Sequence, residues 1–148
     1  MKNDVIELDE LWSFVYSKDN KRWVWVAICR RTRQIVACFV GNRGQKSCRK
    51  FWKSIPDAYR RCRSYSDYWK TYAAVITTGK HHCVSKNSGQ TNHGERWNNT
   101  LRQRIGRFVR QTLSFSKCDV MHKLYLKLLF ITITYHSLID TTKKSSHS

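Results

Sequence analysis

Three β-rich segments joined by short polar stretches occupy residues 5–41, and no other feature constrains the fold as strongly. In the first segment, alternate apolar residues such as Ile6, Leu8 and Phe14 share one parity, which is typical of a strand. The polar residues 17–22 predict a hairpin turn into RWVWVAICR, and RRTRQ predicts a second turn into IVACFVG. We therefore expect an antiparallel three-stranded meander at the start of the chain.

The order of the later segments predicts an α/β fold. Residues 44–55 have the apolar spacing of a helix that ends at Pro56, and residues 68–76 predict another helix. Short strands are expected at 60–67 and 81–85. With a length of 148 residues, the chain is long enough for one domain. We expect a mixed sheet, in which parallel strands join the meander, flanked by helices.

The last apolar segment, residues 120–139, is expected to be a helix because of its length, although the β-branched run ITIT favours a strand. Its apolar stripe consists of Met121, Leu124, Leu128, Ile131, Tyr135 and Leu138. Residues 1–140 are expected to form the one domain, and the polar residues 141–148 a disordered tail.

Basic residues dominate the charge of the chain. The 28 Lys and Arg residues outnumber the 10 Asp and Glu residues, which gives a formal net charge of +18 and a pI near 10.1. Such a charge predicts attraction to polyanions, with nucleic acid as the leading partner. A membrane is disfavoured because every apolar run, such as Leu128 to Ile131, is far shorter than the roughly 20 residues of a spanning helix. The N-terminus also lacks the apolar region of a signal peptide, so we expect a cytoplasmic protein.

The six cysteines include no C-x-x-C pair, which indicates reduced thiols rather than a disulfide framework or a zinc ribbon. A zinc site built from His81, His82, Cys83 and His93 is disfavoured, because their spacing matches no common ligand pattern. Ordinary strand and loop positions explain these residues better.

The stretch TNHGERWNNTLRQR, residues 91–104, places Glu95 in an otherwise basic and amide-rich helix that follows a loop. Between Asp67 and Asp119 it is the only acidic residue. At helical spacing, Asn98, Asn99 and Arg102 follow it at i+3, i+4 and i+7 and share its face. This face can hold a metal cation and a phosphate side by side.

Two more carboxylates complete a candidate site. Asp9 lies on the first expected strand and Asp67 at the end of the fourth, so only the fold can bring them to Glu95. Three converging carboxylates suit Mg²⁺, which takes oxygen ligands and keeps several waters for substrate phosphates. Two such ions can assist the attacking and leaving oxygens of a phosphoryl displacement.

Each of these carboxylates also has a structural interpretation. Glu95 can pair with Asn92 in a capping box, and Asp67 can cap the helix that follows it. Glu10 replaces Asp9 as the ligand if the strand register is shifted by one residue. Asp4 and Glu7 are interpreted as residues of a solvated strand edge. His93 is either a contact to metal or phosphate or an ordinary loop residue, and Trp97 is either a core residue or a platform for base stacking.

Four stretches of the chain resemble the catalytic half of the insertion sequence 1 family of DDE transposases: LDELWSFV, KRWVWVAICRRTRQIVACFVG, YSDYWKTY and TNHGERWNNTLRQR. The resemblance runs from about residue 6 to residue 117 and implies an RNase H-like fold. It implies that Asp9, Asp67 and Glu95 are catalytic and bind Mg²⁺ or Mn²⁺, with Asp9 bridging two ions. The implied activity is phosphodiester hydrolysis at transposon ends followed by strand transfer into target DNA, in the bacterial cytoplasm and at the nucleoid.

Double-stranded DNA is the implied partner, and synapsis of two ends implies a homodimer or a higher assembly. The residues expected to contact DNA are Arg96, Asn98, Asn99, Arg102, Arg104, Arg107 and Arg110. In complete family members a zinc-binding and helix-turn-helix region from an upstream frame precedes the catalytic part, so a protein of that kind is a further possible partner. Two alternatives remain: an RNase H-like nuclease without strand transfer, and a non-catalytic DNA-binding remnant of a transposase.

Overall fold

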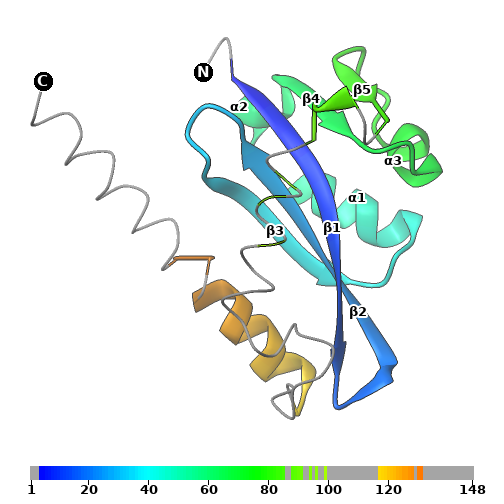
Figure 1. The fold of residues 1–148 in the computed structure, drawn as a ribbon, viewed down its shortest axis with the longest axis vertical. Coiled ribbons are helices and arrows are strands. Elements are labelled where there is room, and N and C mark those ends of the chain that lie inside the picture. The colour runs from blue at the N-terminus through cyan, green and yellow to red at the C-terminus, as the bar shows by residue number, and fades with distance from the viewer. Residues whose placement is uncertain are drawn as a thin grey trace, which may run out of the picture.

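The computed structural model describes residues 4–85, 88–91, 94, 96, 99, 117–128, 130 and 131. Five strands form one sheet in the order β3-β2-β1-β4-β5. The strands are β1 (Val5–Val15), β2 (Ser17–Cys29), β3 (Ile35–Gly41), β4 (Arg63–Ser66) and β5 (His81–Cys83). The helices are α1 (Gln45–Ser54), α2 (Asp57–Arg60) and α3 (Lys70–Val75), and residues 119–128, 130 and 131 are also helical. Helices therefore cover both faces of the sheet (Figure 1).

The strand directions confirm the mixed α/β sheet. β2 runs antiparallel to both β1 and β3, which gives the expected meander. β4 runs parallel to β1, and β5 runs parallel to β4. Parallel neighbours need crossover connections, and the chain makes them through α1 and α2 and then through α3.

The first turn is tighter than the hairpin predicted for residues 17–22. A single residue, Tyr16, separates β1 from β2, and its φ of 66° lies in the left-handed region that non-glycine residues rarely adopt. The register shifts here from Phe14 opposite Lys21 to Val15 opposite Ser17, so the polar stretch is an irregular part of β2. The second predicted turn is confirmed.

The short helix α2 was not predicted, because four residues are too few to show a helical periodicity. Pro56 was expected only to end the preceding helix. Its carbonyl oxygen also accepts hydrogen bonds from the N–H groups of Tyr59 and Arg60, at 2.9 and 3.0 Å, and so begins α2.

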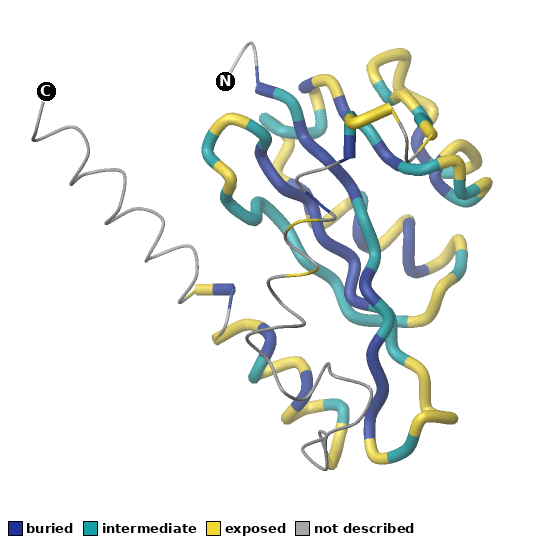
Figure 2. Tube along the Cα trace, viewed as in Figure 1, coloured by how far each residue is buried: buried dark blue, intermediate teal, exposed yellow. Residues whose placement is uncertain are grey.

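The two central strands separate two hydrophobic layers (Figure 2). Ile6 and Leu8 of β1 pack in a cluster with residues of α1 and α3 such as Phe51. Leu11 packs on the opposite face with Leu126 of the C-terminal helical segment. Because side chains alternate along a strand, β1 presents its odd-numbered residues before Leu11 to this second face.

The apolar stripe recognised in residues 120–139 does not pack on the sheet. Met121, Leu124, Leu128 and Ile131 are 53%, 49%, 64% and 66% exposed. A different face of the helical segment is buried, formed by His122, Leu126 and Phe130. The sequence did not reveal this buried face because His122 interrupts its apolar pattern. In the structure, the His122 Nε2 lies 3.3 Å from the Ser13 hydroxyl, so a polar contact stands where an apolar one was expected.

Within the part of the chain that the structure describes, no helix combines the length and the apolar character needed to cross a membrane. All six cysteines are free thiols, as expected from their spacing. Residues 132–148, which include Tyr135, Leu138 and the expected polar tail, lie outside the described residues.

Candidate carboxylate site

The register between β1 and β4 is the geometry on which the candidate site depends. These parallel strands pair Val5 with Arg63, Ile6 with Ser64 and Glu7 with Tyr65. Two residues further along each strand stand Asp9 and Asp67. The pairing ends at Glu7 and Tyr65; continued by two residues, past the end of β4 at Ser66, the same register would set Asp67 opposite Asp9.

Asp9 lies half-buried on the sheet face that also carries Leu11. Its carboxylate Oδ1 accepts a hydrogen bond from the N–H of Glu10 at 2.8 Å. The backbone of Gly94 packs directly against it: a Cβ built on Gly94 would lie 3.2 Å from the Asp9 Cβ and 3.3 Å from its Oδ2. Only glycine allows so close an approach without moving the aspartate.

Glu7 lies two residues before Asp9 and is only 1% exposed, so its interpretation as a solvated edge residue is wrong. Its Oε1 accepts a hydrogen bond from the Arg30 Nε at 2.8 Å, and its Oε2 accepts one from the Gly94 N–H at 3.1 Å. The same guanidinium donates to the side-chain and backbone oxygens of Gln90, at 3.0 and 2.6 Å. We call Glu7, Arg30, Gln90 and Gly94 the clasp, because they fasten the chain on both sides of residue 92 to β1 and β2.

The clasp was not predicted, although a signal was present. Glu7 has the parity of Asp9 and Leu11 within an otherwise apolar strand. A carboxylate buried in that way needs a cationic partner, because an unpaired buried charge is very costly. The sequence could not say which of the many arginines supplies it. The interpretation of Asp4 as a solvated residue is wrong for the same reason, since it is 4% exposed and pairs with Arg31.

Asp67 lies directly after β4. Its Oδ1 accepts a hydrogen bond from the Trp69 N–H at 3.1 Å, which closes a local Asx-type turn. The N-cap of α3 is Trp69, with no side-chain cap, so Asp67 does not cap this helix as one interpretation proposed. Among the described residues it forms no ion pair.

Glu10 points to the other face of the sheet from Asp9. One oxygen accepts a hydrogen bond from the Tyr72 hydroxyl at 2.7 Å, and the other accepts two from Arg43, at 2.8 and 3.1 Å. The Arg43 guanidinium is itself stacked on the rings of Trp23 and Trp69, 4.5 Å from each centroid. Both Glu10 oxygens are thus engaged by protein groups on the face of the sheet that also carries Tyr72.

Burial raises the pKa of Glu10, although the hydrogen bonds from Tyr72 and Arg43 act in the opposite direction. The negative charge of Asp67 adds to the rise, so Asp67 lies close enough to interact with Glu10. Burial likewise raises the pKa of the Tyr72 hydroxyl well above its usual value, with the charges of Glu10 and Asp9 contributing. Carboxylates from β1 and the end of β4 therefore share one electrostatic environment.

His81, one of the disfavoured zinc ligands, holds β4 and β5 together. Its Nδ1 lies 2.9 Å from the Ser64 hydroxyl, and its Nε2 lies 3.2 Å from that of Ser66 and 3.6 Å from the Cys83 sulfur. Burial lowers the pKa of His81 to about 4, with the neighbouring His82 adding to the effect. In the described part of the chain, no three His, Cys, Asp or Glu residues are grouped so that they could hold a metal ion.

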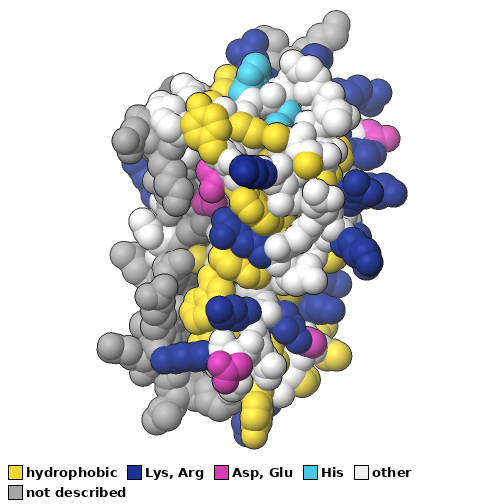
Figure 3. All heavy atoms as spheres, turned by 90° about the vertical axis from the view of Figure 1, so that its right-hand side faces the viewer, with side chains coloured by type: hydrophobic (Ala, Val, Ile, Leu, Met, Phe, Trp, Pro, Cys, Tyr) yellow, Lys and Arg dark blue, Asp and Glu magenta, His cyan; other side chains and the backbone are white. Residues whose placement is uncertain are grey.

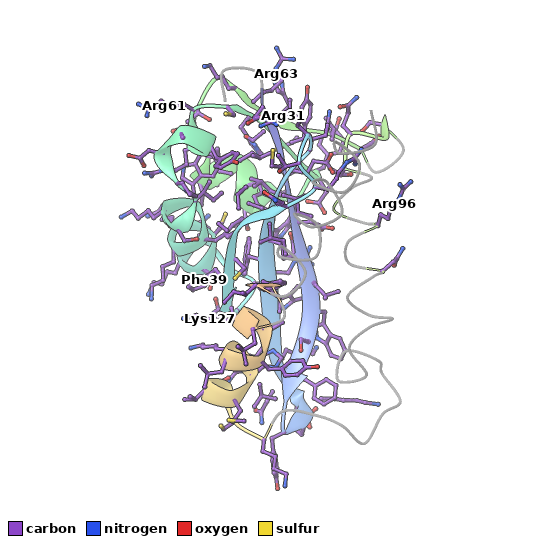
Figure 4. The ribbon with its side chains drawn as sticks, turned by 90° about the vertical axis from the view of Figure 1, so that its left-hand side faces the viewer. Arg31, Phe39, Arg61, Arg63, Arg96 and Lys127 are labelled. Carbon is purple, nitrogen blue, oxygen red and sulfur yellow. The ribbon has the colours of Figure 1, made fainter. Side chains whose placement is uncertain are left out.

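In the segment that contains Glu95, the structure describes Gly94, Arg96 and Asn99. Arg96 and Asn99 are described and exposed, and Arg96 projects outward from the body of the molecule (Figure 4). The predicted residues that lie outside the described ones are Glu95, Asn98, Arg102, Arg104, Arg107 and Arg110, together with Asn92, His93 and Trp97.

One face of the molecule is strongly basic. Lys and Arg side chains recur over the described face seen in Figure 3, whereas Asp and Glu side chains form isolated spots. A polyanion approaching this face is attracted overall.

Sequence comparisons show to which family the chain belongs. The family model for the IS1 transposase matches residues 4–136, which include Asp9, Asp67 and Glu95. The chain belongs to the IS1 transposase family. It is 34% identical over 121 residues to the insertion element iso-IS1n protein InsB of Shigella dysenteriae, covering 80% of this chain and 88% of that protein. It is also 34% identical over 116 residues to the insertion element IS1 protein InsB of Shigella flexneri, covering 78% and 86% of the two chains.

A third relative is the insertion element IS1 4 protein InsB of Escherichia coli K12, which is 33% identical over 123 residues, or 81% of this chain and 71% of that protein. Family membership confirms the resemblance found in the sequence.

Proposed function

We propose that this chain is a divalent-metal-dependent DNA transposase that hydrolyses a phosphodiester bond at a transposon end and transfers the new 3′ end into target DNA. The proposal includes an RNase H-like fold, with Asp9, Asp67 and Glu95 as the catalytic residues. The observation that supports it is the parallel pairing of β1 with β4, which ends at Glu7 and Tyr65, two residues before Asp9 and Asp67 respectively.

The sheet supports the fold assignment. An antiparallel meander is followed by two parallel strands added on the β1 side, in the order β3-β2-β1-β4-β5. This order makes β1 the central strand, so Asp9 stands in the middle of the sheet and not at its rim.

Gly94 supports the assignment of Glu95. It donates to Glu7 and packs on Asp9. Because Glu95 is covalently joined to Gly94, its Cα is only about 3.8 Å from that of Gly94. A glutamate side chain starting there can reach the Asp9 carboxylate.

The donor set fits a hard divalent cation. Asp9 and Asp67 present carboxylate oxygens on adjoining strands, and Glu95 would complete the set. Mg²⁺ or Mn²⁺ bound there would supply Lewis-acid stabilisation of charge at the scissile phosphate. The protein itself holds the carboxylates in place: β1 fixes Asp9, the Trp69 N–H orients Asp67, and the clasp fastens the chain at Gly94.

DNA contacts are proposed for the Glu95 helix, at Arg96, Asn98, Asn99, Arg102, Arg104, Arg107 and Arg110. Guanidinium groups pair well with phosphate oxygens, and the exposure of Arg96 is compatible with that role. The proposal also includes a homodimer or higher assembly and a location in the bacterial cytoplasm. It further includes a partner protein from an upstream frame, with zinc-binding and helix-turn-helix elements.

The test is cleavage of a duplex that carries the DNA flanking this gene, with Mg²⁺, Mn²⁺ or EDTA. Asp9→Asn, Asp67→Asn and Glu95→Gln are expected to abolish metal-dependent cleavage while the proteins remain folded and bind DNA. Asp57→Asn is the matched control, because this aspartate begins α2, its side chain is 71% exposed, and its ion pair is with Arg60 of the same helix. The metal-site proposal fails if Asp9→Asn cleaves as fast as the unchanged protein.

Joining to a plasmid separates the alternatives. A transposase gives joined products from a pre-cut end with a free 3′-hydroxyl. An RNase H-like nuclease nicks the plasmid without joining, and a remnant binds the DNA without either reaction.

A further inference from the structure

A groove with four lysines lies at the outer edge of the sheet. It has a volume of about 600 Å³, and its floor is the outermost strand, β3, at residues 38–41. One wall is the first half of α1 and the other is the helical segment that includes residues 123–127. Figure 4 shows Phe39 and Lys127 together between these two helices, on the opposite side of the view from Arg96.

The lysines form two pairs, one on each wall of the groove. Lys46 and Lys50 are one helical turn apart on α1, and Lys123 and Lys127 are one turn apart on the other wall. All four are exposed, and none forms an ion pair among the described residues. Residues one turn apart have Cβ atoms about 5–6 Å from each other, so each pair presents two ammonium groups in a row.

Among the residues that the structure describes, no carboxylate lines the groove, since the other lining residues are Cys38, Phe39, Val40, Gly41, Asn42, Ser47 and Leu126. Asp119, one turn before Lys123, is a nearby carboxylate whose pKa is lowered by its hydrogen bond with Arg22 and, to a smaller extent, by Lys123. Like charges one turn apart destabilise a helix, and here two such pairs line the same groove. The amino end of α1 adds partial positive charge, since Gly44 provides no side-chain cap. The groove is thus a place where an anion would relieve repulsion.

The groove is separate from the candidate carboxylate site. β3 is two strands away from β1, which carries Asp9, and three away from β4, which Asp67 follows. An extended polyanion could therefore occupy the groove without approaching the carboxylates. A single strand of DNA backbone matches this geometry, with successive phosphates running between the two rows of lysines.

We propose that this groove is a second DNA-binding surface, which holds the phosphodiester backbone of a duplex segment away from the reacting phosphate. The inference adds to the proposed function but is tested without it, because binding is measured in EDTA, where no metal-dependent reaction occurs. Its rival is that the lysines only prevent the exposed edge of β3 from pairing with another chain, a common use of lysine at sheet edges.

The experiment measures binding of a short fluorescent duplex by anisotropy between 50 and 200 mM salt, the range over which backbone contacts show their effect. The variant replaces Lys46, Lys50, Lys123 and Lys127 by Gln. The matched control replaces Lys18, Lys21, Lys70 and Lys80 by Gln; these are also exposed and do not line the groove.

If each groove lysine contacts one phosphate, the slope of log K against log salt falls by about 0.9 per lysine, or roughly 3.6 in all. The control variant is expected to change the slope by less than half as much. Variants of each pair alone, expected to lower the slope by about 1.8, keep the test available if the fourfold variant does not fold.

An equal change of slope in the groove variant and the control overturns the proposal, because it would show only the effect of net charge. An unchanged slope combined with new dimers or aggregates in light scattering would assign the lysines to edge protection instead. Failure of metal-dependent cleavage in the unchanged protein would refute the proposed function and leave the binding result standing.

Discussion

Replacement of Glu7 by Gln is the most informative test of how the site is built. The carboxylate is 1% exposed and accepts two hydrogen bonds, from the Arg30 Nε at 2.8 Å and the Gly94 N–H at 3.1 Å. An amide of the same shape can accept one of these bonds, but it turns an N–H group toward the other donor. It also leaves the Arg30 guanidinium without its counter-charge.

The expected loss of stability follows from these contacts. A hydrogen bond to a charged group contributes about 1.5–3 kcal/mol. Breaking a fully buried ion pair costs about 3–5 kcal/mol, but Arg30 is 28% exposed, so water can relieve part of that cost. We therefore expect Glu7→Gln to reduce the free energy of unfolding by about 2–3 kcal/mol.

The assay is urea unfolding followed by tryptophan fluorescence, combined with hydrogen exchange of the Gly94 amide. The Glu7→Gln variant is expected to speed exchange at Gly94, and to lower metal-dependent cleavage if Glu95 is catalytic. A double variant with Arg30→Met should cost at least 1 kcal/mol less than the sum of the single changes, because the two sites are in contact.

The matched control is Asp119→Asn, which breaks the pair between Arg22 and Asp119. That pair has a similar length, 2.7 Å, but its side chains are 32% and 46% exposed, so its loss should cost at most about 1 kcal/mol. The reasoning is refuted if Glu7→Gln costs no more than this control and exchange at Gly94 is unchanged.

Three other predictions test the surroundings of the site. Gly94→Ala should slow cleavage about tenfold or more, because the new methyl group meets the Asp9 carboxylate at 3.3 Å. The control Gly79→Ala should leave the cleavage rate unchanged, because its new methyl group has nothing within 4 Å. Equal cleavage rates in the two variants would contradict this prediction. Arg43→Ala should reduce the free energy of unfolding by about 2–4 kcal/mol. Arg43→Lys should recover only part of this stability, since lysine lacks the planar group that stacks on the two rings. Full recovery of the stability in urea unfolding would show that charge alone matters. The pKa of His81 is about 4 in the folded protein and near 6.5 when unfolded, so the stability that this residue contributes is complete above pH 6.5 and is lost as the pH falls toward 4. The free energy of unfolding, measured in urea, should therefore decline over this range, and about 1–2 kcal/mol of the decline should be absent in His81→Gln. An identical decline in the variant would refute the assignment.

Local patterns accounted for most elements of the fold. Alternating apolar residues predicted the meander, and the helical spacing around Phe51 predicted α1. One error arose at α2, because a helix of four residues is too short to show a helical periodicity in the sequence. Another arose at Tyr16, where a single residue with positive φ takes the place of the expected turn. The helical segment from residue 119 was recognised, but its buried side depends on contacts with the sheet that no local pattern contains.

The sequence by itself determined the strand and helix types, the strong positive charge, and the identity of Asp9 and Asp67 as unusual carboxylates, because these follow from composition and from neighbours along the chain. It also carried the family relationship, which resides in residue identity. Only the tertiary structure decided that β4 pairs in parallel with β1, that Glu10 turns toward Tyr72, and that Gly94 rests on Asp9. The physical reason is that strand pairing and buried charge pairing join residues that are distant in sequence, so their partners are selected by the packed fold as a whole.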